Sequence, residues 1–380
     1  MTSSDRPFIP FDLERWQSLW ENHVSYNLTE SGVHPMTLKE LAGTDTGLLD
    51  EVLNLEINYP QTNGTLELRG AIAHWYEGAG VDNVHVTTGA AQANFTTLLT
   101  ILQGEEKDAE IAVLLPNYMQ IWGIAKNLGV TVNTFSLKEE QDWALDLDEL
   151  EQAVTEKTRL IAVCNPNNPT GHIFTPDEMD GVVEIARKND AWLLSDEVYA
   201  GAELHREDVT PSFWGRYEKV LAIGSMSKAY GLPGLRVGWV VAPEAITQAL
   251  WEQQDYITIS ASMLGNKLAA YALSPEVRPR ILTRTRKYIR RGYKFFENWL
   301  QEQGDLFTVV KPQAAAIAFV RYHLDVNSTE LCSRLRDEKD VFIVPGDHFG
   351  LDQHVRISFG LSKAYLNESL SRFREVLKSY

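Results

Sequence analysis

Two candidate nucleophiles lie three positions apart in GSMSKAYGLPGLRVGW, residues 224–239: Ser225 and Lys228. The run from Ser225 to Lys228 fits Ser-x-x-Lys, a pattern in which the serine is the nucleophile of an acyl-transfer reaction. In the other interpretation Lys228 carries the chemistry, and Arg236 follows it eight residues later between two glycines. The two interpretations describe unrelated enzymes, so the rest of the chain must decide between them.

The serine hypothesis requires two further elements, Ser-Asp-Asn and Lys-Thr-Gly. The chain has Ser-Asp-Glu at 195–197 in place of the first, and the Lys-Thr pair at 157–158 is followed by an arginine. No Lys-Thr-Gly occurs anywhere in the sequence. The chain therefore lacks the two motifs that the serine mechanism requires, and Lys228 is the stronger candidate.

The elements that must position this lysine alternate along the chain between residues 84 and 242. Short apolar runs are separated by amphipathic segments, the clearest of which begins with a capping box formed by Thr175 and Glu178 around a proline. Such alternation predicts an α/β fold with a mostly parallel sheet flanked by helices, and the run 238–243 predicts an added antiparallel strand. The main predicted strands are 84–88, 109–116, 130–137, 158–166, 191–198 and 219–225.

The pattern changes after about residue 274, where a long charged helix is followed by short strands and a final helix. This part of the chain indicates a smaller α+β domain. We therefore expect three parts: an N-terminal segment, 1–45, packing with the small domain; a large α/β domain, 46–275; and the small domain, 276–380.

Unusual polar residues follow five of the predicted strands, and the carboxyl ends of parallel strands are where α/β proteins bind ligands. The sequence therefore predicts that these strand ends converge on one crevice. The segments concerned are Gly89, 116–118, 165–171, Asp196 and 225–228.

Composition excludes several other classes of protein. A net charge of −17 argues against nucleic acid as a partner, and the basic stretch 278–294 is typical of a solvated helical face. Cys164 and Cys332 are too few for a disulfide framework or a zinc site. No apolar run approaches the ~18 residues that span a bilayer, and the first residues lack a signal-peptide pattern, so we expect a cytoplasmic protein with no membrane partner.

The sequence Ser-x-Ser-Lys followed by Gly-Leu-Arg-Val-Gly resembles the cofactor-lysine signature of class I/II aminotransferases, which are fold-type I pyridoxal-phosphate enzymes. The resemblance covers almost the whole chain, with the elements in the family's order. It implies an aspartate-aminotransferase-like large domain, pyridoxal 5'-phosphate as cofactor, and a Schiff base between that cofactor and Lys228.

The resemblance also implies a phosphate site. Ser225 and Arg236 match the phosphate ligands that flank the lysine, and TTGAAQANF, residues 87–95, resembles the glycine loop whose backbone amides at Ala90 and Ala91 cup the phosphate. Tyr59 matches a tyrosine that reaches the phosphate from the other subunit of a homodimer, although it could instead be a packing aromatic.

Four further residues match positions around the cofactor ring. Asp196 matches the carboxylate that keeps the ring nitrogen protonated, with a turn aspartate as the alternative. Tyr199 and Asn168 match the partners of the ring oxygen. Tyr118 matches an aromatic that stacks on the ring, with a core tyrosine as the alternative.

For the substrate, Arg356 matches the family's carboxylate-binding arginine, with an internal salt bridge as the alternative. Asn168 is also expected to contact the substrate. Gly32 lies where many members carry Gly-x-Pro-Asp-Phe in a loop over the substrate, and here the sequence 31–34 is Ser-Gly-Val-His. Glu30 and His34 could sense a basic side chain, or be ordinary loop residues.

The stretch around 31–34 and the sequence DYITIS at 255–260 resemble the capreomycidine synthase branch of fold-type I enzymes, which cyclises a hydroxylated arginine derivative. A second departure is 312–319, PQAAAIAF, where many members have a Gly-Gly pair. The leading hypothesis is an aminotransferase acting on an amino acid and a keto acid. The alternative is a pyridoxal-phosphate-dependent cyclase, lyase or oxidase acting on a basic amino acid.

A third hypothesis comes from another class, a pyridoxal-phosphate-binding transcription regulator. Such proteins attach this fold to an N-terminal DNA-binding domain. Fewer than about 90 residues precede the glycine loop here, and the family pattern uses most of them, which leaves no room for a helix-turn-helix unit.

Overall fold

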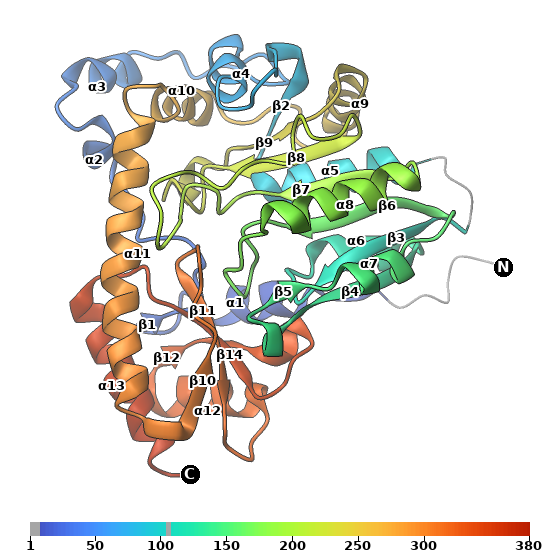
Figure 1. Ribbon diagram of the computed structural model, residues 1–380. Helices are drawn as coiled ribbons and strands as arrows, with labels where there is room; N and C mark the ends of the chain where they lie inside the picture. The colour runs from blue at the N-terminus through green and yellow to red at the C-terminus, as the bar shows by residue number, and fades with distance from the viewer. Residues whose placement is uncertain (1–7, 104–107) are drawn as a thin grey trace.

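The structure, a computed structural model, describes residues 8–103 and 108–380. A large sheet carries helices on both faces, and a smaller sheet lies beside it (Figure 1). In spatial order the strands of the large sheet are β2 (Val84–Thr87), β9 (Gly238–Val241), β8 (Val220–Ser225), β7 (Trp192–Asp196), β6 (Thr158–Cys164), β3 (Glu110–Leu115), β4 (Thr131–Lys138) and β5 (Ala144–Leu145).

Five neighbouring strands of this sheet, from β8 to β4, are parallel. Strand β9 runs antiparallel to both β8 and β2, as the run 238–243 predicted. The two-residue edge strand β5, antiparallel to β4, was not predicted, because so short a strand has no pattern of its own. The prediction of a mostly parallel α/β sheet flanked by helices is confirmed.

The apolar runs are continuous because both faces of the sheet are buried. In β3, Ile111 and Val113 pack in one cluster with α5 (Gly89–Leu102), α6 (Gln120–Leu128) and α9 (Glu244–Gln254), whereas Ala112 and Leu114 face the opposite cluster. That second face is covered mainly by α4 (Leu66–Ala73), α7 (Leu147–Ala153), α8 (Pro176–Lys188) and α10 (Met263–Ala272). The predicted capping box of Thr175 and Glu178 starts α8.

The smaller sheet is antiparallel and has a hydrophobic cluster of its own. The helix α11 (Arg278–Gln301) runs beside both sheets (Figure 1). The strands are, in spatial order, β10 (Phe307–Val309), β11 (Ile317–Tyr322), β14 (His354–Ser358) and β13 (Val344–Pro345), with α12 (Ser328–Lys339) and α13 (Lys363–Leu377) packed against them.

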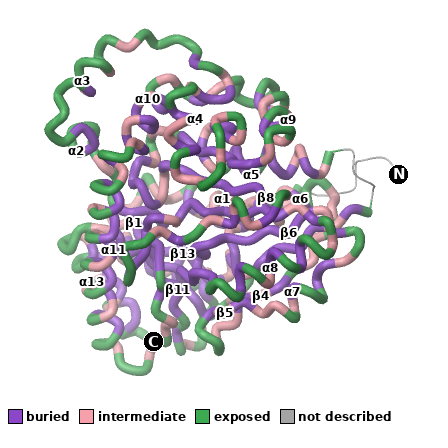
Figure 2. Tube along the Cα trace, turned by 45° about the horizontal axis from the view of Figure 1, so that its top comes forward, coloured by how far each residue is buried: buried purple, intermediate pink, exposed green. Residues whose placement is uncertain are grey.

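The N-terminal segment joins the two sheets. Its helix α1 (Asp12–Trp20) is followed by β1 (Tyr26–Asn27), which pairs in parallel with β12 (Val341–Phe342) next to the small sheet. The helices α2 (Leu38–Ala42) and α3 (Thr46–Leu53) then lead to α4 along a stretch that is largely exposed (Figure 2). Among the described residues no helix is long and apolar enough to cross a membrane.

Candidate active site

The carboxyl ends of the parallel strands border a cavity of about 350 Å³. The N-terminal segment and the small sheet also contribute to its walls. Of the site residues that the sequence predicted, the structure brings together at this cavity Ala90, Ala91, Tyr118, Asn168, Asp196, Tyr199, Ser225, Lys228, Arg236 and Arg356.

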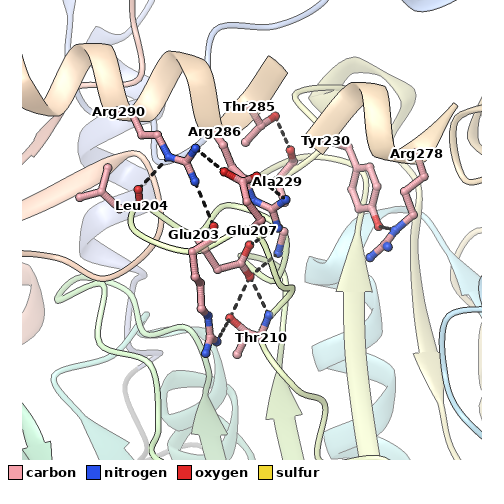
Figure 3. Close-up of polar contacts among 12 residues, drawn as sticks. Glu203, Leu204, Glu207, Thr210, Ala229, Tyr230, Arg278, Thr285, Arg286 and Arg290 are labelled. Atoms are coloured by element: carbon pink, nitrogen blue, oxygen red, sulfur yellow. Dashed lines mark hydrogen bonds and ion pairs between the residues drawn. The ribbon is translucent and has the colours of Figure 1, made fainter. Parts of the chain in front are cut away.

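Lys228 lies in the loop that follows β8, and α11 holds this loop in place (Figure 3). The hydroxyl of Thr285 donates a hydrogen bond to the carbonyl of Ala229 at 2.6 Å, and Arg278 Nε donates to the hydroxyl of Tyr230 at 2.9 Å. Both contacts fix the two residues directly after the lysine. The position of Lys228 therefore depends on a helix that borders both sheets.

The same stretch of α11 is anchored by a buried polar group, which we call the Glu203 network: Glu203, Thr210 and Arg286 (Figure 3). Arg286 Nη2 donates to the Glu203 carboxylate at 2.7 Å. The other Glu203 oxygen accepts hydrogen bonds from the Thr210 amide at 2.7 Å and from its hydroxyl at 2.9 Å. Glu203 is fully buried, so this carboxylate is satisfied entirely within the chain.

Lys228 is partly buried, and the loss of hydration lowers the pKa of its ammonium group. Glu30 acts in the opposite direction, and the positive charges of Arg356 and Arg236 add to the lowering. A lysine with a lowered pKa is more often neutral near pH 7, which is the form that attacks carbonyl groups and accepts protons.

Asp196 ends β7 and is buried at the edge of the cavity. One carboxylate oxygen accepts a hydrogen bond from the Val198 amide at 3.3 Å, and the other accepts one from Asn94 Nδ2 at 3.3 Å. Burial raises the pKa of Asp196, and the two hydrogen bonds and the nearby Lys228 partly offset this rise.

Arg356 lies in β14, between the strands of the small sheet, and is 2% exposed. Its Nη1 donates to Asn168 Oδ1 at 3.0 Å, and its Nη2 donates to the carbonyl of Thr29 at 2.5 Å. These acceptors are neutral, and within the described part of the chain Arg356 forms no ion pair and its Nε has no partner. Burial lowers the pKa of this guanidinium. The described residues therefore form no internal salt bridge with Arg356.

The end of the cavity beside the start of α5 is rich in hydrogen-bond donors. The helix α5 begins at Gly89, whose φ is 79°, and no side chain caps its first turn, where Ala90 and Ala91 lie. A Cβ on Gly89 would lie 2.4 Å from Arg236 Nη2, so the guanidinium rests directly over this backbone. Uncapped amides, a helix dipole and an arginine together favour an anion at this end.

Two tyrosines close the sides of the cavity. The Tyr199 hydroxyl donates to Ser31 Oγ at 2.9 Å, and burial raises its pKa. The Tyr118 hydroxyl donates to the carboxylate of Glu14, which comes from α1. Both tyrosines are thus held by the N-terminal segment.

Two predicted residues do not line the cavity. Tyr59 is 78% exposed in the stretch between α3 and α4. Gly32 is buried against the lysine loop, where an added Cβ would lie 3.1 Å from the carbonyl oxygen of Ser227. The neighbouring residues Glu30 and Ser31 do line the cavity.

Sequence reasoning missed several residues of the cavity wall. Glu14, Gln17 and Glu21 come from α1 and the turn after it, and their spacing of three and four places them on one helical face, a signal that could have been used. Asn94 and Gln120, near the starts of α5 and α6, have no such signal. Burial raises the pKa of Glu21, and Glu30 and Glu14 add to the effect, so these acidic groups are close to each other.

Comparison with known proteins agrees with this geometry. Residues 54–373 match the family model described as aminotransferase class I and II. The chain is 30% identical to capreomycidine synthase of Streptomyces vinaceus over 97% of its length and 94% of that protein, and 29% identical to an aspartate aminotransferase of Thermotoga maritima over 85% and 84%. A solved pyridoxal-phosphate-dependent aminotransferase from Streptococcus suis superimposes with a TM-score of 0.91, at 29% identity and covering 99% of each chain.

The cavity fits pyridoxal phosphate, the cofactor of this family. The uncapped start of α5 and Arg236 suit the phosphate, and the buried Asp196 suits a protonated ring nitrogen. Arg356 Nε is buried without a partner in the described chain, as expected of a site built around a further group. The chain is a pyridoxal-phosphate-dependent transferase and belongs to the aminotransferase class I and II family.

Proposed function

We propose that this protein moves an amino group from an L-amino acid to a keto acid. The observation that carries the proposal is Arg356, a buried guanidinium whose hydrogen bonds within the described chain go to neutral oxygens. A buried charge is costly without a counter-charge. The α-carboxylate that amino acids and keto acids share would supply that counter-charge through a two-point contact.

The chain's own residues divide the work around the substrate. Pyridoxal phosphate, when bound, supplies an aldehyde that combines with amines and a ring that withdraws electrons from the substrate's Cα. In our proposal Lys228 Nζ would hold the cofactor covalently and, once released, would take the proton from Cα and deliver it to the former aldehyde carbon of the cofactor, not back to Cα. Asp196 keeps a proton on the ring nitrogen, and Arg356 orients the carboxylate.

The remaining predicted residues would position the cofactor. Tyr199 and Asn168 would bind the ring oxygen, and Asn168, already hydrogen-bonded to Arg356, would also border the substrate. Tyr118 would stack on the ring, and Gly32 would bring the N-terminal segment close to the substrate. The phosphate would be bound by Ser225, Arg236 and the amides of Ala90 and Ala91.

A second candidate is a cyclase, lyase or oxidase acting on a basic amino acid. The similarity to capreomycidine synthase over 97% of the chain favours it. So do the carboxylates of Glu14, Glu21 and Glu30 in the cavity wall, because they would attract a cationic side chain.

An amino-acid panel separates the two candidates. Each purified reaction contains one amino acid, with or without a keto acid, under air or nitrogen. Aminotransferase activity requires the keto acid and yields a new amino acid without oxygen. Product formation that is independent of keto acid would instead identify the second candidate, with oxygen consumption for an oxidase and without it for a cyclase or lyase.

We also propose a cytoplasmic homodimer whose chain divides into the parts 1–45, 46–275 and 276–380. Leu53, Ile57 and Tyr59 are each more than three-quarters exposed on the stretch that leads to α4, which suits burial against a second copy. Tyr59 would then reach the partner's phosphate site. A fully active monomer in analytical ultracentrifugation would contradict this assembly.

A further inference from the structure

A chain of amide hydrogen bonds connects the start of α5 with the end of β7. Gln120 Nε2 donates to the carbonyl of Ala91 at 2.8 Å. Asn94 Nδ2 donates to Gln120 Oε1 at 3.1 Å and to Asp196 Oδ2 at 3.3 Å. Asn94 is 2% exposed and its hydrogen bond to Asp196 is buried, whereas the hydrogen bond from Gln120 to Ala91 is exposed.

The direction of this chain is fixed at one end. The Ala91 carbonyl can only accept, so Gln120 must turn its NH₂ group toward it and its oxygen toward Asn94. Asn94 must then present its NH₂ group to both Gln120 and Asp196. Its Oδ1 is left buried without a partner among the described residues, which is the cost of that orientation. A reversed amide would set an oxygen against the Asp196 carboxylate.

We propose that Asn94 and Gln120 are positioning residues for Asp196, which keep its carboxylate ionised and aimed at the ring nitrogen of the cofactor. Gln120 acts through Asn94 by ensuring that Asp196 meets a donor. The inference rests on the role proposed above for Asp196. It adds a link between the phosphate end of the site, at Ala91, and the ring end.

The charges around Asp196 make such a donor necessary. Burial raises the pKa of Asp196, and burial together with the charge of Asp196 in turn raises the pKa of the adjacent Glu197. Burial raises the pKa of Cys164, at the end of β6, and of Tyr199, which favours their neutral forms, and neither group has a cationic form. Lys228 is the cation that lowers the pKa of Asp196, and its charge changes with its proton. A fixed amide donor does not titrate.

The test uses holoenzyme loaded with cofactor labelled with ¹⁵N in the ring, whose chemical shift reports the proton on that nitrogen. In the wild type the ring nitrogen is expected to be protonated near pH 7. In Asn94→Leu the shift should move toward the unprotonated value, and the dissociation constant of the cofactor should rise about tenfold. Thr97→Val is the matched control, since Thr97 is fully buried one turn later on α5 and its hydroxyl has no partner in the described chain.

Gln120→Leu is a second test. Gln120 is partly exposed, so this substitution does not require the buried side chains around Asn94 to repack. It should move the ring shift in the same direction by a smaller amount. The double variant should match Asn94→Leu alone, because Gln120 acts through Asn94. Additive effects of the two substitutions would contradict the proposed order.

Two outcomes overturn different claims. A protonated ring nitrogen in the wild type and in both single variants alike would overturn the positioning role of Asn94 and Gln120. An unprotonated ring nitrogen in the wild type would overturn the role of Asp196 itself, and with it the basis of this inference.

Discussion

Two buried arginines in this molecule meet opposite surroundings. Arg286, in the Glu203 network, faces a fully buried carboxylate at 2.7 Å and a second one, of Glu207, at 3.7 Å. Arg356, equally buried, meets an amide oxygen and a backbone carbonyl. The first charge is paired within the chain, whereas the second has no carboxylate within ion-pair distance among the described residues. Arg286 therefore serves folding, and Arg356 is available to a ligand.

The contrast between Arg356 and Arg286 predicts the largest effect, a loss of activity, for Arg356→Leu. Two charge-assisted hydrogen bonds to the substrate carboxylate are lost, so kcat/KM should fall about 10³-fold, or about 4 kcal/mol. The melting temperature should change little, because a buried charge without a counter-ion is removed. Steady-state kinetics and thermal unfolding measure the two quantities. A large loss of stability with nearly full activity would show that Arg356 serves folding and does not bind the substrate.

The opposite pattern is expected for Glu203→Gln. Removing one partner of a buried ion pair leaves Arg286 uncompensated, at a cost of about 3–4 kcal/mol in the free energy of unfolding. The kcat/KM of the folded protein should fall far less than in Arg356→Leu, because Glu203 supports the helix beside the Lys228 loop but does not line the cavity. Glu207→Gln is the matched control, since Glu207 faces the same arginine from an exposed position, and urea unfolding should barely detect it. Equal losses in the free energy of unfolding for Glu203→Gln and Glu207→Gln would show that the buried carboxylate is no more important than the exposed one.

The carboxyl groups of Asp196, the last residue of β7, and of Glu197, directly after it, also have contrasting surroundings. Asp196 borders the cavity, whereas Glu197 is buried and accepts a hydrogen bond from the Phe213 amide at 2.9 Å. Burial raises the pKa of Glu197 to about 7. The folded protein therefore holds this proton more tightly than the unfolded chain, and stability falls as the pH rises from about 4.5 to about 7.

Glu197→Gln should remove this fall, by up to about 3 kcal/mol above pH 7, because the side chain no longer ionises. Urea unfolding of both proteins at several pH values between 4 and 8 measures the difference. Parallel stability curves for the two proteins would show that Glu197 does not titrate in this range.

The smallest effect is expected for Tyr199→Phe. It removes one hydroxyl, which donates to Ser31 and would bind the cofactor's ring oxygen, so kcat/KM should fall about tenfold. Ser31→Ala separates the two contacts by removing the Ser31 hydroxyl alone. If Ser31→Ala lowered kcat/KM as much as Tyr199→Phe, the tyrosine would act only by holding the N-terminal segment.

The sequence predicted the sheet because strands buried on both faces are continuous apolar runs, and it predicted a shared crevice because parallel strands end at one edge. The spacing of Glu14, Gln17 and Glu21 places them on one helical face, but it does not show that this face lies over the crevice. Nor could the sequence show what surrounds Arg356, because Thr29 and Asn168 are distant in the chain and meet it only after folding. Asn94 was missed for the same reason.

The central claim is that Arg356 binds the carboxylate of the substrate. Binding of two ligands to two proteins tests this claim directly. The best amino acid of the panel and its carboxamide are each titrated into the wild type and Arg356→Leu, with the cofactor's absorbance as readout. The wild type should bind the carboxamide about 100-fold more weakly than the acid, and the variant should bind both alike. The same 100-fold preference in both proteins would contradict the account.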